Sequence, residues 1–303
     1  MSAPDDQAYD LPDKATDPGG FKTRIQRFYG FWNRRIGSSD FAELSLFMNW
    51  GYLPGLSDEA VLAPRPDAIN ASSVRLILEL VGPSAIAGAD ILDVGCGRGG
   101  TVDTLLGYYQ PRHVTGLDLT PENIAFCQSA VRSERCRFLE GDAENLPFDD
   151  ARFDIVTNVE SSHCYPDIRR FYRQVARVLK PGGLFLYTDV FDTADVAQRM
   201  IDLADCGLDI LSDRDITPNV LMAREAEGDP QLVEMDKAAG TGSPDDADER
   251  VLDLVVARPG SQMHVAMQAG RLSYRILRAR KRMATGATGL GRIAARAQAR
   301  RGT

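Results

Sequence analysis

The sequence predicts an α/β fold in which a doubly wound, mainly parallel sheet is covered by helices on both faces. Short apolar runs alternate with helical segments of roughly ten residues or more, a pattern typical of crossover units between parallel strands. The first run ends in the glycine-rich turn ILDVGCGRGG at residues 91–100, which brings free backbone N–H groups to a helix start. Ligands of such sheets bind at this edge, beyond the carboxyl ends of the strands.

Three segments precede the alternation. Residues 1–20 are rich in Asp, Pro and Gly and are expected to be disordered. Residues 21–69 hold aromatic side chains at helical spacing and predict an N-terminal helical lid. The segment ASSVRLILELVG carries its apolar residues on one face and ends at Gly82-Pro83, the stop signal of a helix.

Five apolar runs then predict successive strands: ADILDVG, HVTGLD, CRFLEGD, FDIVTNV and GGLFLYTDV. The helices expected between them include TVDTLLGYY, PENIAFCQSAVR and DIRRFYRQVARVLK. The segment VAQRMIDLADCGLDIL predicts one more helix and strand, and RLSYRILR alternates well enough for a final strand.

An insertion at about residues 216–270 separates these last two strands. It opens with DITPNV, where Asp215 and Thr217 are candidate helix caps, and a further helix is expected within 250–269. The main domain therefore spans residues 70–282, and a small, basic, flexible tail follows it. The tail covers residues 283–303.

Composition is that of an ordinary globular protein, because 44% of the 303 residues are hydrophobic and 26% are charged. No apolar run approaches the ~18 residues of a membrane span, and the N-terminus lacks the basic start and apolar stretch of a signal peptide. We expect a cytoplasmic protein without stable membrane insertion. Five cysteines without a C-x-x-C pair argue against a disulfide framework and a zinc site.

Charge is unevenly distributed. From Arg271 onward there are ten Lys or Arg and no Asp or Glu, so residues 1–270 carry 25 basic and 43 acidic residues, a net charge of −18. Nucleic acid is not an expected partner of that acidic body. The basic tail leaves contact with an anionic carrier, membrane or nucleic acid open, although such runs are most often solvated. A homodimer also stays open.

The glycine turn fits two ligands. Gly95, Gly97 and Gly100 satisfy G-x-G-x-x-G, and Asp118 lies 23 residues past Gly95, so a nicotinamide dehydrogenase is one candidate. Three features oppose it. About ninety residues precede the turn, Asp142 in GDAENLPF ends the third strand where it can receive an adenine amine, and ARVLKPGG leads through a glycine turn into another strand.

Together, D-V-G-C-G-R-G, the acid in GLDLT, GDAENLPF, FDIVTNVESSH and LKPGGLFLYTDV resemble the class I S-adenosylmethionine-dependent methyltransferases over about residues 70–212. The resemblance implies a Rossmann-like, seven-stranded sheet whose last strand is antiparallel, and RLSYRILR is the candidate for that strand. It also implies S-adenosyl-L-methionine as the cofactor.

The resemblance assigns cofactor-binding residues at the strand ends and in the lid: Tyr52, Asp93, Gly95, Cys96, Gly97, Gly99, Asp118, Leu119, Asp142, Ala143 and Asn158. The glycine turn passes under the methionine part, with Asp93 ordering it, while Asp118 takes the ribose hydroxyls. Asp142 meets the adenine ring and Asn158 closes the methionine side. A simpler interpretation makes Asp93 or Asp118 a loop cap, and Cys96 is small filler rather than a nucleophile.

A methyl carbon on a sulfonium must meet its nucleophile in line, so catalysis is largely orientation, with proton removal when the acceptor is a hydroxyl. Of three histidines, His113 starts the second strand and is expected to be structural, and His264 is expected on a helix surface. His163 follows the fourth strand in NVESSHCYPD, which resembles the E-S-x-H pattern of sugar and polyketide O-methyltransferases. We predict His163 as the general base, oriented or assisted by Asp189; a packing or substrate-contacting role is the alternative.

Both tryptophans lie in the lid, and Asn49-Trp50-Gly51-Tyr52 resembles the N-x-G-Y element of macrolide, cyclic peptide and mycobacterial glycolipid methyltransferases. An aromatic cap that also holds Phe31, Trp32 and Phe47 would shield the sulfonium and wall a bulky acceptor, unless these are only core helices. Residues expected at the acceptor are Trp50, Glu160 and Tyr165.

These patterns favour methyl transfer to a hydroxyl of a small secondary metabolite: a polyketide, macrolide, glycoside or lipid-like molecule, as in antibiotic biosynthesis. A C- or N-methyltransferase on a small molecule is the nearest alternative. The sequence reads NVES where base- and amide-modifying enzymes carry N/D-P-P-Y. A non-catalytic or cyclase protein on the same fold stays open. No metal is expected, although strand-end carboxylates leave magnesium open.

Overall fold

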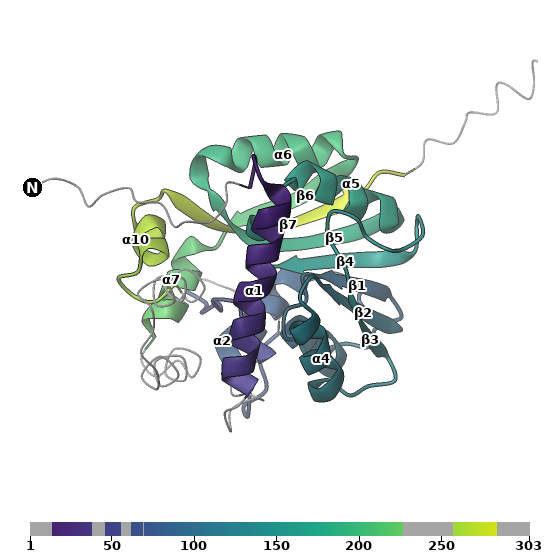
Figure 1. Cartoon of the computed structure of the whole chain (residues 1–303), viewed down its shortest axis with the longest axis horizontal. Helices are drawn as coiled ribbons and strands as arrows, with labels where there is room; N and C mark the ends of the chain where they lie inside the picture. The colour runs from purple at the N-terminus through teal and green to yellow at the C-terminus, as the bar shows by residue number, and fades with distance from the viewer. Residues whose placement is uncertain (1–13, 38–45, 56–61, 69, 227–256, 284–303) are drawn as a thin grey trace, which may run out of the picture.

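The computed structural model describes residues 14–37, 46–55, 62–68, 70–226 and 257–283, and Figure 1 shows their arrangement. A seven-stranded sheet forms the centre, with strand order β3-β2-β1-β4-β5-β7-β6. Its strands are β1 Asp90–Val94, β2 His113–Asp118, β3 Cys136–Glu140, β4 Phe153–Val159, β5 Leu179–Asp192, β6 Leu208–Asp215 and β7 Leu272–Lys281. Strands β1 to β5 pair in parallel, and β7 pairs antiparallel with β5 and β6. The predicted sheet and its antiparallel last strand are confirmed.

Helices cover both faces of this sheet, as the alternation of strands and helices predicts. They are α2 Ala71–Val81, α3 Gly100–Tyr108, α4 Pro121–Ala130, α5 Ile168–Val178 and α6 Val196–Asp205. Adjacent strand residues point to opposite faces, and both faces are buried. Pairs that divide in this way are Ile91 with Leu92, Ile155 with Val156 and Leu186 with Phe185. A sheet buried on both sides explains why its strands read as continuous apolar runs.

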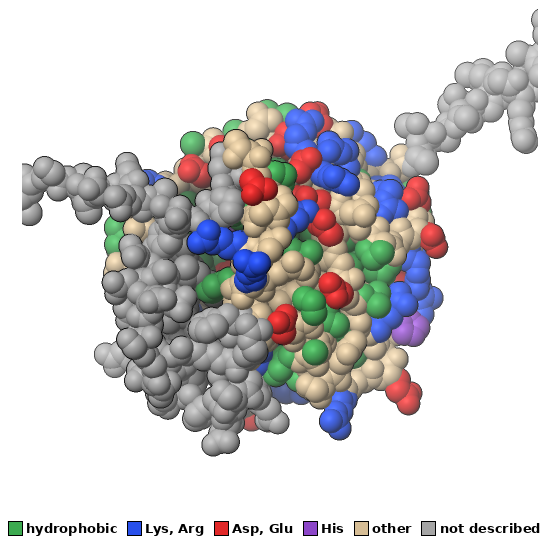
Figure 2. Space-filling model, in the orientation of Figure 1, with side chains coloured by type: hydrophobic (Ala, Val, Ile, Leu, Met, Phe, Trp, Pro, Cys, Tyr) green, Lys and Arg blue, Asp and Glu red, His purple; other side chains and the backbone are tan. Residues whose placement is uncertain are grey.

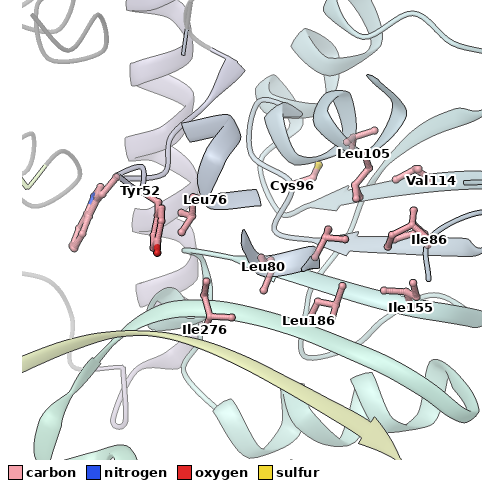
Figure 3. Packing of buried hydrophobic residues seen from close by; sticks show 14 of the residues in the cluster. Tyr52, Leu76, Leu80, Ile86, Cys96, Leu105, Val114, Ile155, Leu186 and Ile276 are labelled. Atoms are coloured by element: carbon pink, nitrogen blue, oxygen red, sulfur yellow. The ribbon is translucent and has the colours of Figure 1, made fainter. Parts of the chain in front are cut away.

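One face packs against α2, α3 and α4. Figure 3 shows Leu76 and Leu80 of α2 beside Ile155, Leu186 and Ile276 of the sheet. Each of these side chains is at most 2% exposed, and full burial of such a side chain stabilises the fold by about 1.5–3 kcal/mol. The opposite face packs mainly against α5. The strand that leads into the glycine turn, β1, is therefore buried on both faces.

The N-terminal helix α1, Pro18–Gly37, crosses the front of the molecule and packs against α4 (Figure 1). It begins at Pro18, so residues 18–20 are helical and do not belong to a disordered terminus. The side chains of Phe31 and Trp32, expected in the aromatic cap, lie outside the described residues.

The insertion before β7 contributes two described helices, α7 Thr217–Glu225 and α10 Gln262–Gln268, which contact each other and β7. The N-cap position of α7 is Ile216, so neither Asp215 nor Thr217 is the cap residue that was expected. Asp215 precedes it and accepts hydrogen bonds from the Thr217 N–H and hydroxyl at 2.9 and 2.6 Å, which satisfies the first N–H of the helix. The remainder of the insertion, 227–256, and the tail from residue 284 lie outside the described residues.

Basic and acidic side chains are interspersed over the face seen in Figure 2, so no single sign of charge dominates the described part of that face. Within the described ranges, no helix has both the length and the apolar character needed to cross a bilayer. The five cysteines are all free thiols.

An ionic cluster lies at the amino ends of the strands, away from the glycine turn. The Asp90 carboxylate accepts from the Arg112 Nε and Nη2 at 3.0 and 2.5 Å and from the Arg152 Nη1 at 3.2 Å. Asp154 in turn pairs with Lys180 at 2.8 Å. The hydrogen bond from Arg112 outweighs burial and lowers the pKa of Asp90 to about 2.

We expect Asp90→Asn to lower the free energy of unfolding by about 1–2 kcal/mol at pH 7, because half-exposed arginines would lose their ionised partner. The pKa of Asp90 in the folded state lies below its unfolded value of about 3.9. This stabilisation is therefore fully present at pH values above about 3.9 and is lost as the pH falls through about 2. Urea unfolding of both proteins at pH 7 and pH 3 measures it. Equal stability at pH 7 contradicts the prediction, and Glu140→Gln at an exposed strand end is the control.

Candidate active site

A cavity of about 890 Å³ lies at the carboxyl ends of the strands. Its walls come from the glycine turn, from the residues that follow β2, β3 and β4, from the first half of α1 and from residues 46–50 of the lid. The volume lies within the range of small-molecule sites. Segments far apart in the sequence therefore meet at one site, at the edge that the fold class predicts.

The glycine turn owes its shape to residues with positive φ. Gly95, Gly97 and Gly99 have φ values of 69°, 52° and 90°, a region that glycine adopts without strain. A Cβ at position 95 would lie closest to the Ser161 side chain and 2.7 Å from the Tyr165 hydroxyl, so any larger residue would displace Ser161 and Tyr165. The Gly95 and Cys96 N–H groups both donate to the Leu117 carbonyl, at 2.7 and 3.0 Å. The turn is thereby tied to the end of β2.

Asp118, at the end of β2, is the carboxylate expected to take the ribose hydroxyls. One of its oxygens accepts from the Gly97 N–H at 2.8 Å, and the other accepts from the Thr120 N–H and the Asn123 amide, both at 2.9 Å. Burial raises the pKa of Asp118 and these hydrogen bonds oppose the rise. The carboxylate also lies at the cavity wall, where a ligand hydroxyl can reach it.

Two buried acceptors lie beneath the turn. Asp93 Oδ1 accepts from the Thr157 hydroxyl at 2.7 Å, whereas Asp93 Oδ2 and Asn158 Oδ1 have no hydrogen-bond partner among the described residues. Burial raises the pKa of Asp93 to about 7, and the Thr157 hydrogen bond opposes the rise. Buried acceptors of this kind need a donor or a positive charge nearby. Both groups lie behind the cavity wall, where positive charge on a ligand above the turn would stabilise them without direct contact.

The adenine end is reached by α1. Asp142 and Ala143 line the cavity after β3, as predicted for an adenine site. Asp142 Oδ2 accepts from the Lys22 ammonium at 2.7 Å, and Lys22 also pairs with Glu144. These contacts tie α1 to the turn that follows β3.

His163 and Asp189 form a hydrogen-bonded pair at the cavity. His163 Nδ1 lies 2.8 Å from Asp189 Oδ1, and the imidazole is 38% exposed whereas the carboxylate is fully buried. Asp189 also accepts from the Ser162 and Val190 N–H groups, both at 2.8 Å. Burial lowers the pKa of His163, but Cys164 and the Asp189 carboxylate outweigh it, so the pKa is raised well above its usual value. Although burial raises the pKa of Asp189, the charge and hydrogen bond of His163 dominate and leave it lowered.

Glu160 connects the lid to this site. The Trp50 N–H donates to both Glu160 oxygens, at 2.9 and 3.1 Å, and the Tyr274 hydroxyl of β7 also donates to this carboxyl group. Glu160 has a φ of 44°, a strained value for a non-glycine residue. Burial raises the pKa of Glu160 to about 8 against the effect of the Tyr274 hydrogen bond. The group is therefore mostly neutral at pH 7.

Most of the predicted site residues line this one cavity: Trp50, Gly95, Cys96, Gly97, Asp118, Leu119, Asp142, Ala143, Glu160, His163 and Tyr165. Asp93, Gly99, Asn158 and Asp189 lie behind its wall. Tyr52 is instead a fully buried core residue, seen beside Leu76 in Figure 3. It does not line the cavity because its N–H is bonded to the Ser72 carbonyl, which draws the chain into the core.

The two remaining histidines lie away from the cavity. His113 is 60% exposed and lies 3.4 Å from Asp90 at the amino ends of the strands, so a structural role is consistent with its position. His264 was expected on the surface, but it is only 4% exposed. Its Nε2 lies 3.0 Å from Glu225 of α7, and α10 packs against α7, which explains the burial.

Sequence reasoning missed the polar face of α1. Lys22, Gln26 and Asn33 contact the residues around the cavity. Their spacing of four and seven residues places them on one helix face, and this was the available signal. Among the described residues, no group of three or more His, Cys, Asp or Glu is arranged to hold a metal ion.

Comparisons with known proteins agree with this geometry. Residues 92–187 match a family model described as a methyltransferase domain. The chain is 33% identical over 258 residues to the phthiotriol/phenolphthiotriol dimycocerosates methyltransferase of Mycobacterium leprae (strain TN), covering 84% of this chain and 90% of that protein. It is 37% identical over 213 residues to the fatty-acid O-methyltransferase of Mycolicibacterium smegmatis (strain ATCC 700084 / mc(2)155), covering 70% and 75%.

Solved structures share the fold. The [4+2]-cyclase SpnF superposes with a TM-score of 0.66 at 22% identity, over 86% of this chain and 96% of that chain. Geranyl diphosphate C-methyltransferase from Streptomyces coelicolor A3(2), crystallised with Mg²⁺, geranyl diphosphate and S-adenosyl-L-homocysteine, gives a TM-score of 0.56 at 19% identity, over 86% and 98%. At these identities the likeness concerns the fold alone.

We expect Asp118→Ala to weaken binding of S-adenosyl-L-homocysteine by about 10–100-fold, because a ligand hydroxyl loses a charged acceptor. Isothermal titration calorimetry measures the dissociation constant. Glu140→Ala is the matched control, since Glu140 is the register partner of Asp118 on β3 but is exposed and outside the cavity. Unchanged affinity in a folded Asp118→Ala protein contradicts the ribose assignment.

Proposed function

Because the chain belongs to the class I S-adenosylmethionine-dependent methyltransferases, we propose that it methylates a hydroxyl oxygen of a lipid-like molecule with His163 as general base. Its reaction class is methyl transfer and its cofactor is S-adenosyl-L-methionine. Two relatives are named for lipid acceptors, dimycocerosates and fatty acids, which supports the acceptor class. The observation that carries the proposal is the hydrogen-bonded pair of His163 and Asp189 beside the glycine turn.

The residues around the cavity are suited to hold the cofactor. When bound, it supplies an electrophilic methyl group on a sulfonium. Asp118 is suited to the ribose and Asp142 to the adenine amine, while the buried carboxyl of Asp93 favours positive charge above the turn. The acidic groups near the methionine end are thus matched to a cationic ligand.

Proton removal is the task of His163. Asp189 is ionised and buried, so the hydrogen bond at 2.8 Å fixes a proton on His163 Nδ1. Nε2 of the neutral ring is then the nitrogen that accepts the proton. In the reaction, the acceptor O–H bond would break and its proton would move to Nε2, while the oxygen would bond to the methyl carbon as the bond from that carbon to the cofactor sulfur breaks, leaving S-adenosyl-L-homocysteine. Asp189 stabilises the resulting imidazolium.

The remaining wall suits an apolar acceptor. Apolar side chains line it from α1, the lid, β5 and α10: Phe21, Ile25, Phe28, Leu46, Phe47, Met48, Val190 and Met263. Trp50 is held at this wall by the hydrogen bond from its backbone N–H to Glu160. Such a wall excludes water from the sulfonium and binds acyl chains through their buried surface.

A carboxylate acceptor is the second candidate. The raised pKa of His163 favours an imidazolium near neutral pH, and an imidazolium binds a carboxylate rather than taking a proton from it. One relative is named for fatty acids. The two candidates differ in their dependence on pH, because one needs neutral His163 and the other needs it charged.

We expect kcat/KM for a hydroxylated lipid to rise with pH through the raised pKa of His163 and then level off. A base acts only when deprotonated, so the rising limb lies above the usual histidine value of about 6.5. Asp189→Asn should move that limb to lower pH, because it removes the negative charge beside the ring. Activity that falls with rising pH over the same range contradicts the base assignment and favours a carboxylate acceptor.

His163→Ala should lower kcat on a hydroxylated lipid by about 10²–10⁴-fold, the usual contribution of general base catalysis, with unchanged affinity for S-adenosyl-L-homocysteine. Production of S-adenosyl-L-homocysteine and mass spectrometry of the product measure turnover and the atom methylated. His113→Ala, at the opposite ends of the strands, is the control. Near-normal turnover of His163→Ala at pH 7, or methylation at carbon or nitrogen, contradicts the proposal.

A further inference from the structure

The polar face of helix α1 is fastened to the adenosine side of the cavity at three points. Lys22 Nζ lies 2.7 Å from Asp142 Oδ2, and the Gln26 amide donates to the Leu119 carbonyl at 2.8 Å. Further along, the Asn33 amide donates to Asn123 of α4. These partners belong to the turns after β3 and β2 and to α4. The helix therefore spans the positions assigned to adenine and ribose.

Asn33 is the centre of a buried polar chain. Its side-chain oxygen accepts from Arg98 Nη1 in the glycine turn, and its amide nitrogen donates to Asn123 Oδ1. The Asn123 amide donates in turn to Asp118 Oδ1 at 2.9 Å. The four residues are between 1% and 8% exposed. A continuous path thus connects α1 to the carboxylate assigned to the ribose.

Arg98 holds this chain together. Its guanidinium carbon lies 3.4 Å from the centroid of the Phe126 ring on α4, and burial lowers its pKa to about 10, so it stays charged at neutral pH. Buried polar and charged groups that lose a partner cost free energy. If α1 moves away, Arg98 and Asn123 each lose their contact with Asn33, and the hydrogen bond that orients Asp118 loses its support.

We propose that Arg98 and Asn33 are positioning residues that couple the docking of α1 to the orientation of Asp118, so that the cofactor product leaves only after α1 lifts. The proposal rests on the proposed function, because it requires S-adenosyl-L-homocysteine as the product. It adds a role for the polar face of α1 and for the arginine of the glycine turn. Neither side chain touches the reacting atoms.

The test compares Asn33→Leu with the unaltered protein. This substitution keeps a similar side-chain size and removes the hydrogen bonds of Asn33 with Arg98 and Asn123, together with the one to the Tyr29 carbonyl within α1. Stopped-flow measurement of S-adenosyl-L-homocysteine release should show a dissociation rate at least about tenfold faster in the variant. The cofactor KM should rise in parallel, with a smaller change in kcat. Asn33→Asp retains an acceptor for Arg98 but has no donor for Asn123 Oδ1, so its release rate should lie between those of Asn33→Leu and the unaltered protein.

Hydrogen exchange supplies a readout that is independent of turnover. S-adenosyl-L-homocysteine should slow amide exchange within residues 18–37 of the unaltered protein, because it secures α1. In Asn33→Leu this protection should be lost. Gln128→Leu is the matched control, since it replaces an exposed amide on α4 outside the cavity. Lys22→Ala, at the half-buried end of the same face, should give a smaller increase in release rate and remains available if Asn33→Leu does not fold.

The outcomes separate the two proposals. If the unaltered protein binds S-adenosyl-L-homocysteine and Asn33→Leu and Lys22→Ala both release it at the same rate as that protein, the coupling is wrong and the proposed function stands. Faster exchange of α1 without faster release also overturns the coupling. If the unaltered protein binds neither S-adenosyl-L-methionine nor S-adenosyl-L-homocysteine, both proposals fail.

Discussion

The buried carboxylate of Asp118 is the interaction on which the site depends. It receives N–H groups from two different turns, at Gly97 and Thr120, and thereby joins the end of β1 to the start of α4. Keeping a carboxylate buried requires that each oxygen be hydrogen-bonded, and Gly97 meets this need because its positive φ aims its N–H at the acid. The need to hydrogen-bond both oxygens of Asp118 therefore fixes the positions of the Gly97 and Thr120 turns at the cavity.

Several acidic side chains lie at this edge, and their surroundings give them different charges. Asp189 stays ionised because His163 and backbone N–H groups surround it. Asp93 and Glu160 have pKa values raised to about 7 and about 8 by burial, so at neutral pH Asp93 is only partly ionised and Glu160 is mostly neutral. A cationic ligand would favour their ionised forms. The ionisation of Asp93 and Glu160 would therefore change when a cationic ligand binds.

The sequence was sufficient for the sheet, its antiparallel last strand and the meeting of His163 with Asp189, because periodicity and strand ends fix these. It was insufficient where partners are distant along the chain: Lys22 meets Asp142, and Asn33 meets Arg98. No local pattern encodes such pairs. Tyr52 is buried away from the cavity wall, which its motif could not predict because a motif gives spacing but not which way the chain turns after Trp50. Roles of individual side chains in binding and catalysis stay predictions.

The antiparallel return of β7 leaves β6 as an outer strand of the sheet. Outer strands expose unpaired backbone groups that invite strand addition and aggregation. Here the ladder has an irregularity between Ile210 and Ser212, and charged side chains follow along β6, with Asp209 and Asp213 paired to arginines. Both features oppose the docking of a second strand. The reversed strand β7 thus leaves an exposed sheet edge at β6, and the charged residues of β6 protect that edge against fibrillar assembly.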